Sequence, residues 1–258
     1  MTRVLVTGSG GQLGKTFKEF IIDYKEGVFD FKTSQELDIT VSEKVDWTLK
    51  KGDYDYCINC AAYTNVEQAE KYPEKAFLVN AEGVKNLAEA CKDHKTTLIH
   101  ISTDYVFDGT KEKPYIVGDL TNPINEYGKS KLNGEKYIRE ILSNYYIIRT
   151  SWLYSKKYGH NFYRTILSKA EQGAELKITD EQKGCPTNTE TLAKFVLEEV
   201  IFGNQAFGTY HVTDGEPMTW FDFAKHILKE NKLTHRANLV LDRNYRTFAK
   251  RPKNSVII

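Results

Sequence analysis

The sequence contains little cysteine, with only four residues, at positions 57, 60, 91 and 185 of 258. Thiols so few and so dispersed exclude the disulfide framework of a small secreted protein. Cys57 and Cys60 form a C-x-x-C, but within a strand this odd spacing sends the two side chains to opposite faces. No second C-x-x-C or nearby histidine pair completes a zinc site. We therefore interpret both cysteines as packing residues and predict no metal site.

The chain also lacks a long apolar run at its start and an excess of one charge. The apolar segment before Gly8 is only Val4 to Val6, far shorter than a signal-peptide core or a membrane span. A net charge of +1 gives no indication of a nucleic-acid or acidic-membrane partner. Repeats and low-complexity linkers are absent as well. We therefore expect a cytoplasmic globular protein.

Segments with the spacing of strands and helices alternate along the first 150 residues. Such alternation predicts a parallel sheet with helices on both faces. We expect an α/β fold in which residues 1–150 form a Rossmann-like, doubly wound dinucleotide-binding domain. The expected strands are 4–7, 55–62, 97–102 and 145–150, and the expected helices are 12–24, 73–93 and 125–142.

Beyond Ser151 the pattern loosens into helical stretches separated by turns that contain glycine or proline. These stretches lie near residues 161–172, 189–201 and 219–230. We predict that residues 151–258 form mainly a smaller C-terminal substrate lobe, with the chain passing between the two lobes. The cleft between lobes is the expected binding site.

Three glycines punctuate the first strand-to-helix junction. Gly8, Gly11 and Gly14, with Gln12 and Leu13 between the last two, satisfy G-x-x-G-x-x-G. Glycines at this point permit a tight turn and close approach of the backbone to a diphosphate, and the following helix N-terminus offers free N–H groups. The alternative is an ordinary glycine turn. The position of these glycines at the first strand-to-helix junction favours a dinucleotide site.

The residues expected to meet the ribose leave the choice of cofactor open, with a preference for NADPH over NADH. Asp30 lies near the distance at which an acidic residue holds the 2′-hydroxyl of NAD, but it falls within the expected strand. Lys32, Thr33 and Ser34 follow and could accept a 2′-phosphate. Further candidates for contact with the cofactor are Asp38, Ile39, Ala61, Ala62, Tyr63 and Thr64. The small alanines admit a flat ring, and packing is an equally plausible role for them.

Tyr127 and Lys131 share one face of an expected helix, because residues four apart are neighbours there. A cation beside a phenol lowers its pKa, which suits a general acid that protonates a carbonyl as hydride arrives. With 16 tyrosines and 36 lysines and arginines, chance alone produces roughly two such pairs. The hydroxyl-rich residues Ser102 and Thr103 upstream strengthen the functional reading. Strand alternation allows only one of these two hydroxyls to face the tyrosine.

Seven motifs lie along nearly the whole chain, at residues 59–67 (NCAAYTNVE), 102–109 (STDYVFDG), 127–131 (YGKSK), 149–154 (RTSWLY), 161–162 (NF), 184–187 (GCPT) and 251–255 (RPKNS). They resemble the extended short-chain dehydrogenase/reductases, and among them the dTDP-4-dehydrorhamnose reductase family. The resemblance implies that NADPH or NADH delivers hydride to C4 of a 4-keto-6-deoxy sugar carried on dTDP, giving dTDP-L-rhamnose. The nucleotide sugar is thus the expected partner.

The same resemblance assigns roles to individual residues. Tyr127 is implied as the proton donor and Lys131 as a ribose ligand that tunes it. Thr103, rather than Ser102, is implied to hydrogen-bond the carbonyl or the tyrosine. The implied sugar or diphosphate contacts are Asp104, Trp152, Asn161 and Arg251, and the implied cofactor contacts include Asn80 and Ile101.

The family also implies features that the residues themselves do not indicate. Its members are often dimers, some with Mg²⁺ at the interface, and they continue past the Arg251 motif with another helix. The apolar end Val256–Ile258 is therefore expected to need cover. Alternatives to the reductase are an epimerase or dehydratase acting on another nucleotide sugar, and a non-catalytic NADP-binding regulatory subunit.

Overall fold

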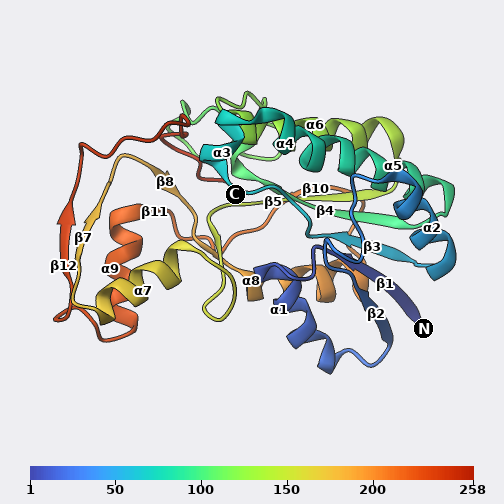
Figure 1. Cartoon of the computed structure of the whole chain (residues 1–258), viewed down its shortest axis with the longest axis horizontal. Helices are drawn as coiled ribbons and strands as arrows, with labels where there is room; N and C mark the ends of the chain where they lie inside the picture. The colour runs from blue at the N-terminus through green and yellow to red at the C-terminus, as the bar shows by residue number, and fades with distance from the viewer.

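Six short strands pair into one parallel sheet, with the order β10-β5-β4-β3-β1-β2. The computed structural model describes residues 1–258. Helices return the chain between strands, so that successive strands point the same way (Figure 1). The strands are β1 (Thr2–Thr7), β2 (Gly27–Phe31), β3 (Tyr56–Asn59), β4 (Thr97–Thr103), β5 (Tyr145–Thr150) and β10 (Gly208–His211). The predicted doubly wound α/β fold is confirmed.

Alternation along the strands separates two apolar layers. Leu5 and Cys57 contribute to one layer, which packs under α2 (Ser42–Gly52), α5 (Gly83–Asp93) and α6 (Glu126–Ile141). Val4 and Val6 contribute to the other, which packs on α1 (Gln12–Phe20) and α8 (Thr189–Lys194), and Cys60 lies against it. Figure 1 shows these two groups of helices on opposite sides of the sheet. The two cysteines therefore do face opposite layers, and neither forms a disulfide.

The helices of residues 1–150 match the predicted ones closely, with two additional helices that the sequence pattern missed. Predicted helix 73–93 is interrupted by a π-helical turn at Leu78–Glu82. The additions are the short helix Val66–Lys71 and α2, whose sequence carries few apolar residues. The helices are α1 (Gln12–Phe20, extended by a 3₁₀ turn at Ile21–Asp23), α2 (Ser42–Gly52), α3 (Val66–Lys71), α4 (Pro73–Phe77), α5 (Gly83–Asp93) and α6 (Glu126–Ile141), with a 3₁₀ turn at Asp104–Val106.

The remaining chain passes back and forth between the large sheet and a separate small core. α7 and α9 pack on the parallel pair β7–β12, at the far end of the molecule from the N-terminus (Figure 1). α8, its π-helical continuation and β10 belong to the large sheet instead. The elements are β6 (Leu153–Tyr154), α7 (Phe162–Glu171), β7 (Glu175–Ile178), β8 (Lys183–Gly184), β9 (Thr187–Asn188), α8 (Thr189–Lys194), the π-helical segment Phe195–Ile201, β11 (Met218–Thr219), α9 (Trp220–Glu230) and β12 (Asn238–Leu241).

The apolar C-terminal residues are covered by the chain itself. Ile257 is fully buried in a cluster with Val106, Phe107, Tyr115 and Leu132, and a β-bridge joins it to Tyr115. Ile258 stays exposed. Residues between 106 and 132 therefore provide the cover that this apolar end was expected to need.

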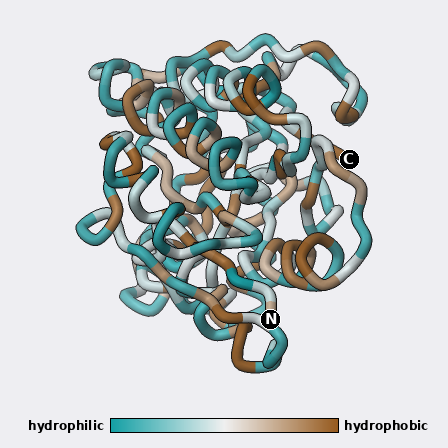
Figure 2. Tube along the Cα trace, turned by 90° about the vertical axis from the view of Figure 1, so that its right-hand side faces the viewer, coloured by the Kyte–Doolittle hydropathy of each residue, from teal (hydrophilic) through white to brown (hydrophobic).

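Hydrophobic and hydrophilic segments alternate along the helices, as Figure 2 shows. Such alternation gives each helix one face for the core and one for solvent. No helix combines the length and apolar character needed to cross a bilayer.

The layer beneath α5 provides a test of the packing. Leu87 is completely buried there, whereas Leu120 is 92% exposed in a loop. We expect Leu87→Ala to lower the free energy of unfolding by about 2–5 kcal/mol, because it removes apolar contacts and leaves a cavity. Leu120→Ala should change it by less than about 0.5 kcal/mol. Chemical denaturation measures both, and equal effects would contradict the assigned core.

Candidate active site

The carboxyl ends of four neighbouring strands meet at one edge of the sheet and border a cavity of about 510 Å³. The strand order reverses between β1 and β3, and ligands bind at such a switch point. The lining residues from the large sheet and its loops are Gly8, Gly11, Gln12, Leu13, Gly14, Cys60, Ala61, Ala62, Thr64, Val66, Ile101, Ser102, Thr103, Asp104, Tyr105, Tyr127, Lys131 and Thr150. Those that follow in the chain are Trp152, Leu153, Gly159, His160, Trp220 and Arg251.

The glycine turn forms one wall of this cavity. Gly8 has φ of +63°, and a side chain there would place its Cβ 2.5 Å from the Ala61 nitrogen. A Cβ on Gly14 would lie 2.5 Å from the Ser9 Cα. Glycine is therefore required at both positions, by conformation at the first and by close approach at both. α1 begins after Gly11 with no side-chain cap and no acidic residue in its first turn, so its N–H groups stay available to an anion.

Gln12, at the start of α1, is tied to the loop that follows β6. Its amide nitrogen donates to the Leu153 carbonyl at 2.9 Å, and its amide oxygen accepts from the Asn161 side chain at 3.0 Å. Asn161 also donates to the carbonyls of Ser155 and Tyr158 and caps α7. Asn161 lies outside the cavity lining, so the structure places it behind Gln12 rather than at the cavity surface.

Tyr127 and Thr103 come together on the cavity floor. Tyr127 lies in the first turn of α6, half-buried, with its ring edge-on to Tyr105 at 5.9 Å between centroids. Burial raises the pKa of Tyr127, opposed by a hydrogen bond with Thr103. This is the reverse of the lowering expected from Lys131. The phenol is consequently protonated at neutral pH, the form that a proton donor requires.

Lys131 is buried one turn further along α6, and its ammonium group is engaged below the cavity. Nζ donates to the Ile101 carbonyl at 2.6 Å and lies 3.2 Å from Nε2 of His100. Burial lowers the pKa of Lys131 to about 8. The expected tuning of Tyr127 by this cation is therefore absent from this arrangement, since its bonds direct Nζ toward β4.

Ser102 and Thr103 point to opposite sides of β4, as strand alternation requires. The Ser102 hydroxyl donates to the Glu135 carboxylate at 2.6 Å, on the side under α6. Glu135 also accepts two bonds from Arg149, at 3.0 and 2.7 Å, in a fully buried ion pair. Ser102 is thus a structural partner of Glu135, and Thr103 is the hydroxyl beside Tyr127.

Asp104, next in the chain, is buried among hydroxyl groups. Its two carboxylate oxygens accept from Thr103 at 3.0 Å and from Ser151 at 2.8 Å. Burial raises the pKa of Asp104 to about 6, and hydrogen bonds from Ser255, Ser151 and Thr103 limit the rise. The carboxyl group lies close to the Tyr127 phenol and destabilises its ionised form.

Asn80 holds the loop after β3 against α6. Its amide oxygen accepts from the Tyr63 N–H at 2.8 Å, and its amide nitrogen donates to the Tyr63 carbonyl at 2.9 Å and to Ser130 at 3.0 Å. Neither Asn80 nor Tyr63 lines the cavity. Asn80 and Tyr63 instead fix the backbone of the loop from which Ala61, Ala62 and Thr64 face the cavity.

Three further residues predicted to contact a cofactor lie away from the cavity lining. Lys32 forms a 3.1 Å ion pair with Asp30 at the end of β2, near the glycine turn. Asp38 is occupied by hydrogen bonds from Thr40. Ile39 is buried against Gly83 at the start of α5. The Asp30 carboxylate also accepts from Tyr54 at 2.5 Å, so it is engaged on both oxygens.

Trp152 reaches the cavity from the turn after β5. Its φ of +47° is unusual for a bulky residue. The indole stacks on Trp220 of α9 with 3.5 Å between ring centroids and an interplanar angle of 3°. Gly184 permits this placement, because a Cβ there would lie 2.5 Å from the Trp152 ring. The sequence indicated Trp152 but not its partner.

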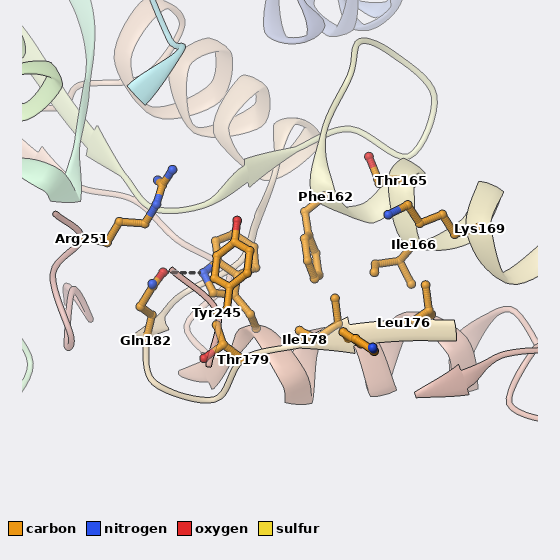
Figure 3. A pocket seen from close by; sticks show the side chains of 12 residues that line it. Phe162, Thr165, Ile166, Lys169, Leu176, Ile178, Thr179, Gln182, Tyr245 and Arg251 are labelled. Atoms are coloured by element: carbon orange, nitrogen blue, oxygen red, sulfur yellow. Dashed lines mark hydrogen bonds between the residues drawn. The ribbon is translucent and has the colours of Figure 1, made fainter. Parts of the chain in front are cut away.

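A second cavity of about 370 Å³ adjoins the first and lies within the small lobe. Trp220 and Arg251 line both cavities. Figure 3 shows Arg251 at one end and Lys169 at the other, with Phe162, Ile178 and other apolar side chains between them. The dashed line marks the bond from the Trp220 indole to Gln182, at 3.0 Å. A cavity with aromatic walls and a cationic side chain at each end suits a ligand in which a flat ring is joined to an anionic group.

Arg251 is held at this junction by two residues from the large lobe. Its guanidinium pairs with Glu67 at 2.7 Å and donates to the Tyr105 hydroxyl at 3.2 Å. The Glu67 carboxylate also accepts from the N–H groups of Phe248 and Ala249. Glu67 lies within a motif noted in the sequence, but nothing local to it indicated a partner 184 residues away. No group of three or more His, Cys, Asp and Glu side chains is arranged to hold a metal ion.

The whole chain, residues 1–258, matches the family model described as the RmlD substrate binding domain. It is 38% identical to a dTDP-4-dehydrorhamnose reductase of Aggregatibacter actinomycetemcomitans, over 100% of this chain and 90% of that protein. The chain belongs to the dTDP-4-dehydrorhamnose reductase family. The predicted family is confirmed.

Two further comparisons show the range of this family. A crystal structure of dTDP-4-dehydrorhamnose reductase from Bacillus anthracis in complex with NADP superposes with a TM-score of 0.95 at 35% identity, covering 100% of this chain and 91% of that one. A dTDP-4-keto-6-deoxy-D-glucose reductase of Streptomyces niveus is 37% identical over 86% of this chain and 76% of that protein. These two relatives are similarly identical in sequence to this chain, but their names give different keto sugars.

The buried Asp104 makes a stability test possible. Its folded pKa of about 6 lies above the ordinary value of 3.8, so the folded state binds more protons between these values. Its contribution to stability is therefore present below pH about 4 and is lost as pH rises through about 6. We expect the unfolding free energy of Asp104→Asn, relative to the native protein, to rise by about 2–3 kcal/mol between pH 4 and 7. If denaturant titrations gave the native protein and Asp104→Asn unfolding free energies that change equally with pH, the raised pKa of Asp104 would be contradicted.

Proposed function

We propose that this protein reduces the C4 keto group of dTDP-4-dehydro-L-rhamnose to give dTDP-L-rhamnose, with NADPH as the reductant. The observation that carries the proposal is the convergence of Tyr127, Thr103 and the Gly8 turn on one cavity at the strand ends. A protonated phenol there faces the same space as a turn suited to a diphosphate. Family membership, rather than the cavity alone, supports this particular sugar.

The residues of the first cavity fit a dinucleotide. The glycine turn and the open N-terminus of α1 would hold the diphosphate, and Ala61, Ala62 and Ile101 would leave room for flat rings. Lys131 would bind the ribose next to the nicotinamide. Lys32, at the end of β2, would meet a 2′-phosphate, which favours NADPH over NADH. Asp38, Ile39, Tyr63 and Asn80 would contribute chiefly by holding the surrounding loops.

NADPH supplies the hydride that becomes bonded to C4 of the sugar. The chain supplies the proton, which passes from the Tyr127 hydroxyl to the carbonyl oxygen as the new C–H bond forms. Thr103 would orient that oxygen or the phenol through its hydroxyl, and to donate to the carbonyl oxygen the hydroxyl must turn from its bond to Asp104. The two transfers together convert the keto group to an alcohol and leave Tyr127 as a phenolate, which then takes up a proton from water.

The two adjoining cavities fit the two parts of a nucleotide sugar. The sugar would lie in the first, in contact with Asp104 and Trp152. The base would lie between the aromatic walls of the second, and Arg251 at the junction would meet the diphosphate. Asn161 would act through Gln12 and the loop after β6.

Homodimer formation and a cytoplasmic location stay predictions, which sedimentation and fractionation would test.

The proton donor is tested by Tyr127→Phe. We expect kcat to fall by about 10²–10⁴-fold, because the ring remains and only the acidic hydroxyl is lost. NADPH affinity should stay within a few-fold of the native value. Turnover is followed as NADPH absorbance consumed per sugar reduced, with a ratio of one for a reductase. No net oxidation of NADPH by the native protein would instead favour an epimerase, a dehydratase or a binding subunit.

The cofactor preference is tested by Lys32→Ala. Loss of a charged contact with phosphate should weaken NADPH binding by roughly tenfold. NADH has no 2′-phosphate, so its affinity should be unchanged. Lys25→Ala, at an exposed position before β2, is the control and should affect neither cofactor. Fluorescence titration measures all three proteins, and equal losses for both cofactors would contradict the assigned contact.

A further inference from the structure

A row of polar side chains runs beneath the cavity floor, across three neighbouring strands. The sheet register pairs Thr7 of β1 with Asn59 of β3, and Asn59 with His100 of β4. All three are buried, on the side covered by α6, and the row ends at Lys131. The proposed reaction uses Lys131 but assigns nothing to Asn59 or His100.

The orientation of the Asn59 amide follows from its partners. Its oxygen accepts from the Ala61 N–H at 3.1 Å and from the Thr7 hydroxyl at 2.7 Å. A backbone N–H can only donate, so the atom facing Ala61 must be the oxygen. The amide nitrogen therefore faces Nδ1 of His100, at 3.1 Å.

This orientation determines the tautomer of His100. The Asn59 NH₂ group can only donate, so Nδ1 of the imidazole must accept and carry no proton. A neutral imidazole then has its proton on Nε2. That nitrogen lies 3.2 Å from Nζ of Lys131. Lys131 consequently meets an N–H donor where an ammonium group would need an acceptor.

We propose that His100 is a positioning residue which, held as the Nε2–H tautomer by Asn59, favours the neutral amine of Lys131 and so lowers the pH at which this lysine loses its proton. Only the amine can accept the imidazole N–H, and two donors facing each other repel. The remaining bond of Nζ, to the Ile101 carbonyl, keeps the group in place in both states.

The other charged and titratable groups around this pair act in the opposite direction or lie elsewhere. Glu135, on α6, and Cys60, after β3, both raise the pKa of Lys131. The Glu135 charge is in turn compensated by Arg149 of β5 and Arg139 of α6. Tyr127 and Asp104 lie on the cavity side. Burial lowers the pKa of Lys131, and burial together with the Lys131 charge keeps the pKa of His100 far below its usual value, so that the ring is neutral.

The tautomer can be measured on the native protein without any turnover. In ¹⁵N NMR of histidine-labelled protein, a protonated and an unprotonated ring nitrogen resonate far apart. We expect the His100 signals, assigned by their loss in His100→Phe, to show a protonated Nε2 and an unprotonated Nδ1 at pH 7. A protonated Nδ1 would overturn the proposal. If His100→Phe does not fold, selective coupling of Nδ1 to the Asn59 amide provides the assignment.

The consequence for Lys131 rests on the proposed function, in which its ammonium group binds the ribose, and is read from the pH profile of kcat/KM. Burial raises the pKa of Tyr127 and lowers that of Lys131, so the alkaline limb follows the lysine. We expect the alkaline limb of His100→Phe to move to higher pH by about one unit, a tenfold change in the proton affinity of Lys131. Thr7→Val is the matched control, because Ala61 alone still orients Asn59, and its limb should not move. A lower rate with an unchanged limb would mean a purely structural role for His100. Because the NMR result requires no activity, failure of the proposed function remains distinguishable from failure of this inference.

Discussion

The structure depends on one constraint, that parallel strands deliver their carboxyl ends to a single edge of the sheet. The Gly8 turn, Ala61 and the turn bearing Trp152 follow β1, β3 and β5, and Thr103 ends β4. These residues therefore meet although they are far apart in the chain. The tight approach of Gly8 to Ala61 is a direct result of this pairing. The helix that carries Tyr127 and Lys131 covers the same edge, so that donor and turn face one space.

The same edge is where the core changes from apolar to polar. Leu5, Cys57 and Leu98 occupy the register positions that precede Thr7, Asn59 and His100 on the α6 side. Buried polar groups are costly unless they are hydrogen-bonded, and here each finds a partner in the next strand. The result is a buried, hydrogen-bonded floor beneath the cavity. Fixed hydrogen-bond partners suit proton transfer, in which small displacements of donor and acceptor are expensive.

Local features were predictable from the sequence, and contacts between distant segments were not. The i, i+4 spacing of Tyr127 and Lys131 and the glycine turn are properties of single segments, and alternation correctly separated Ser102 from Thr103. The bond between Glu67 and Arg251 joins segments whose closeness only the folded chain determines. The expected lowering of the Tyr127 pKa was wrong in direction, because burial raises it and Nζ of Lys131 is bound to the Ile101 carbonyl instead. α2 was missed because its sequence carries few apolar residues.

The central claim is that hydride and proton meet at one sugar carbonyl above this floor. Its most direct test uses NADPH carrying deuterium at both C4 positions of the reduced nicotinamide, with dTDP-4-dehydro-L-rhamnose as substrate. The account predicts a product with one deuterium, bonded to C4 of the sugar, as NMR of the isolated dTDP-L-rhamnose would show. Deuterium at another carbon, or a product without deuterium, would contradict it.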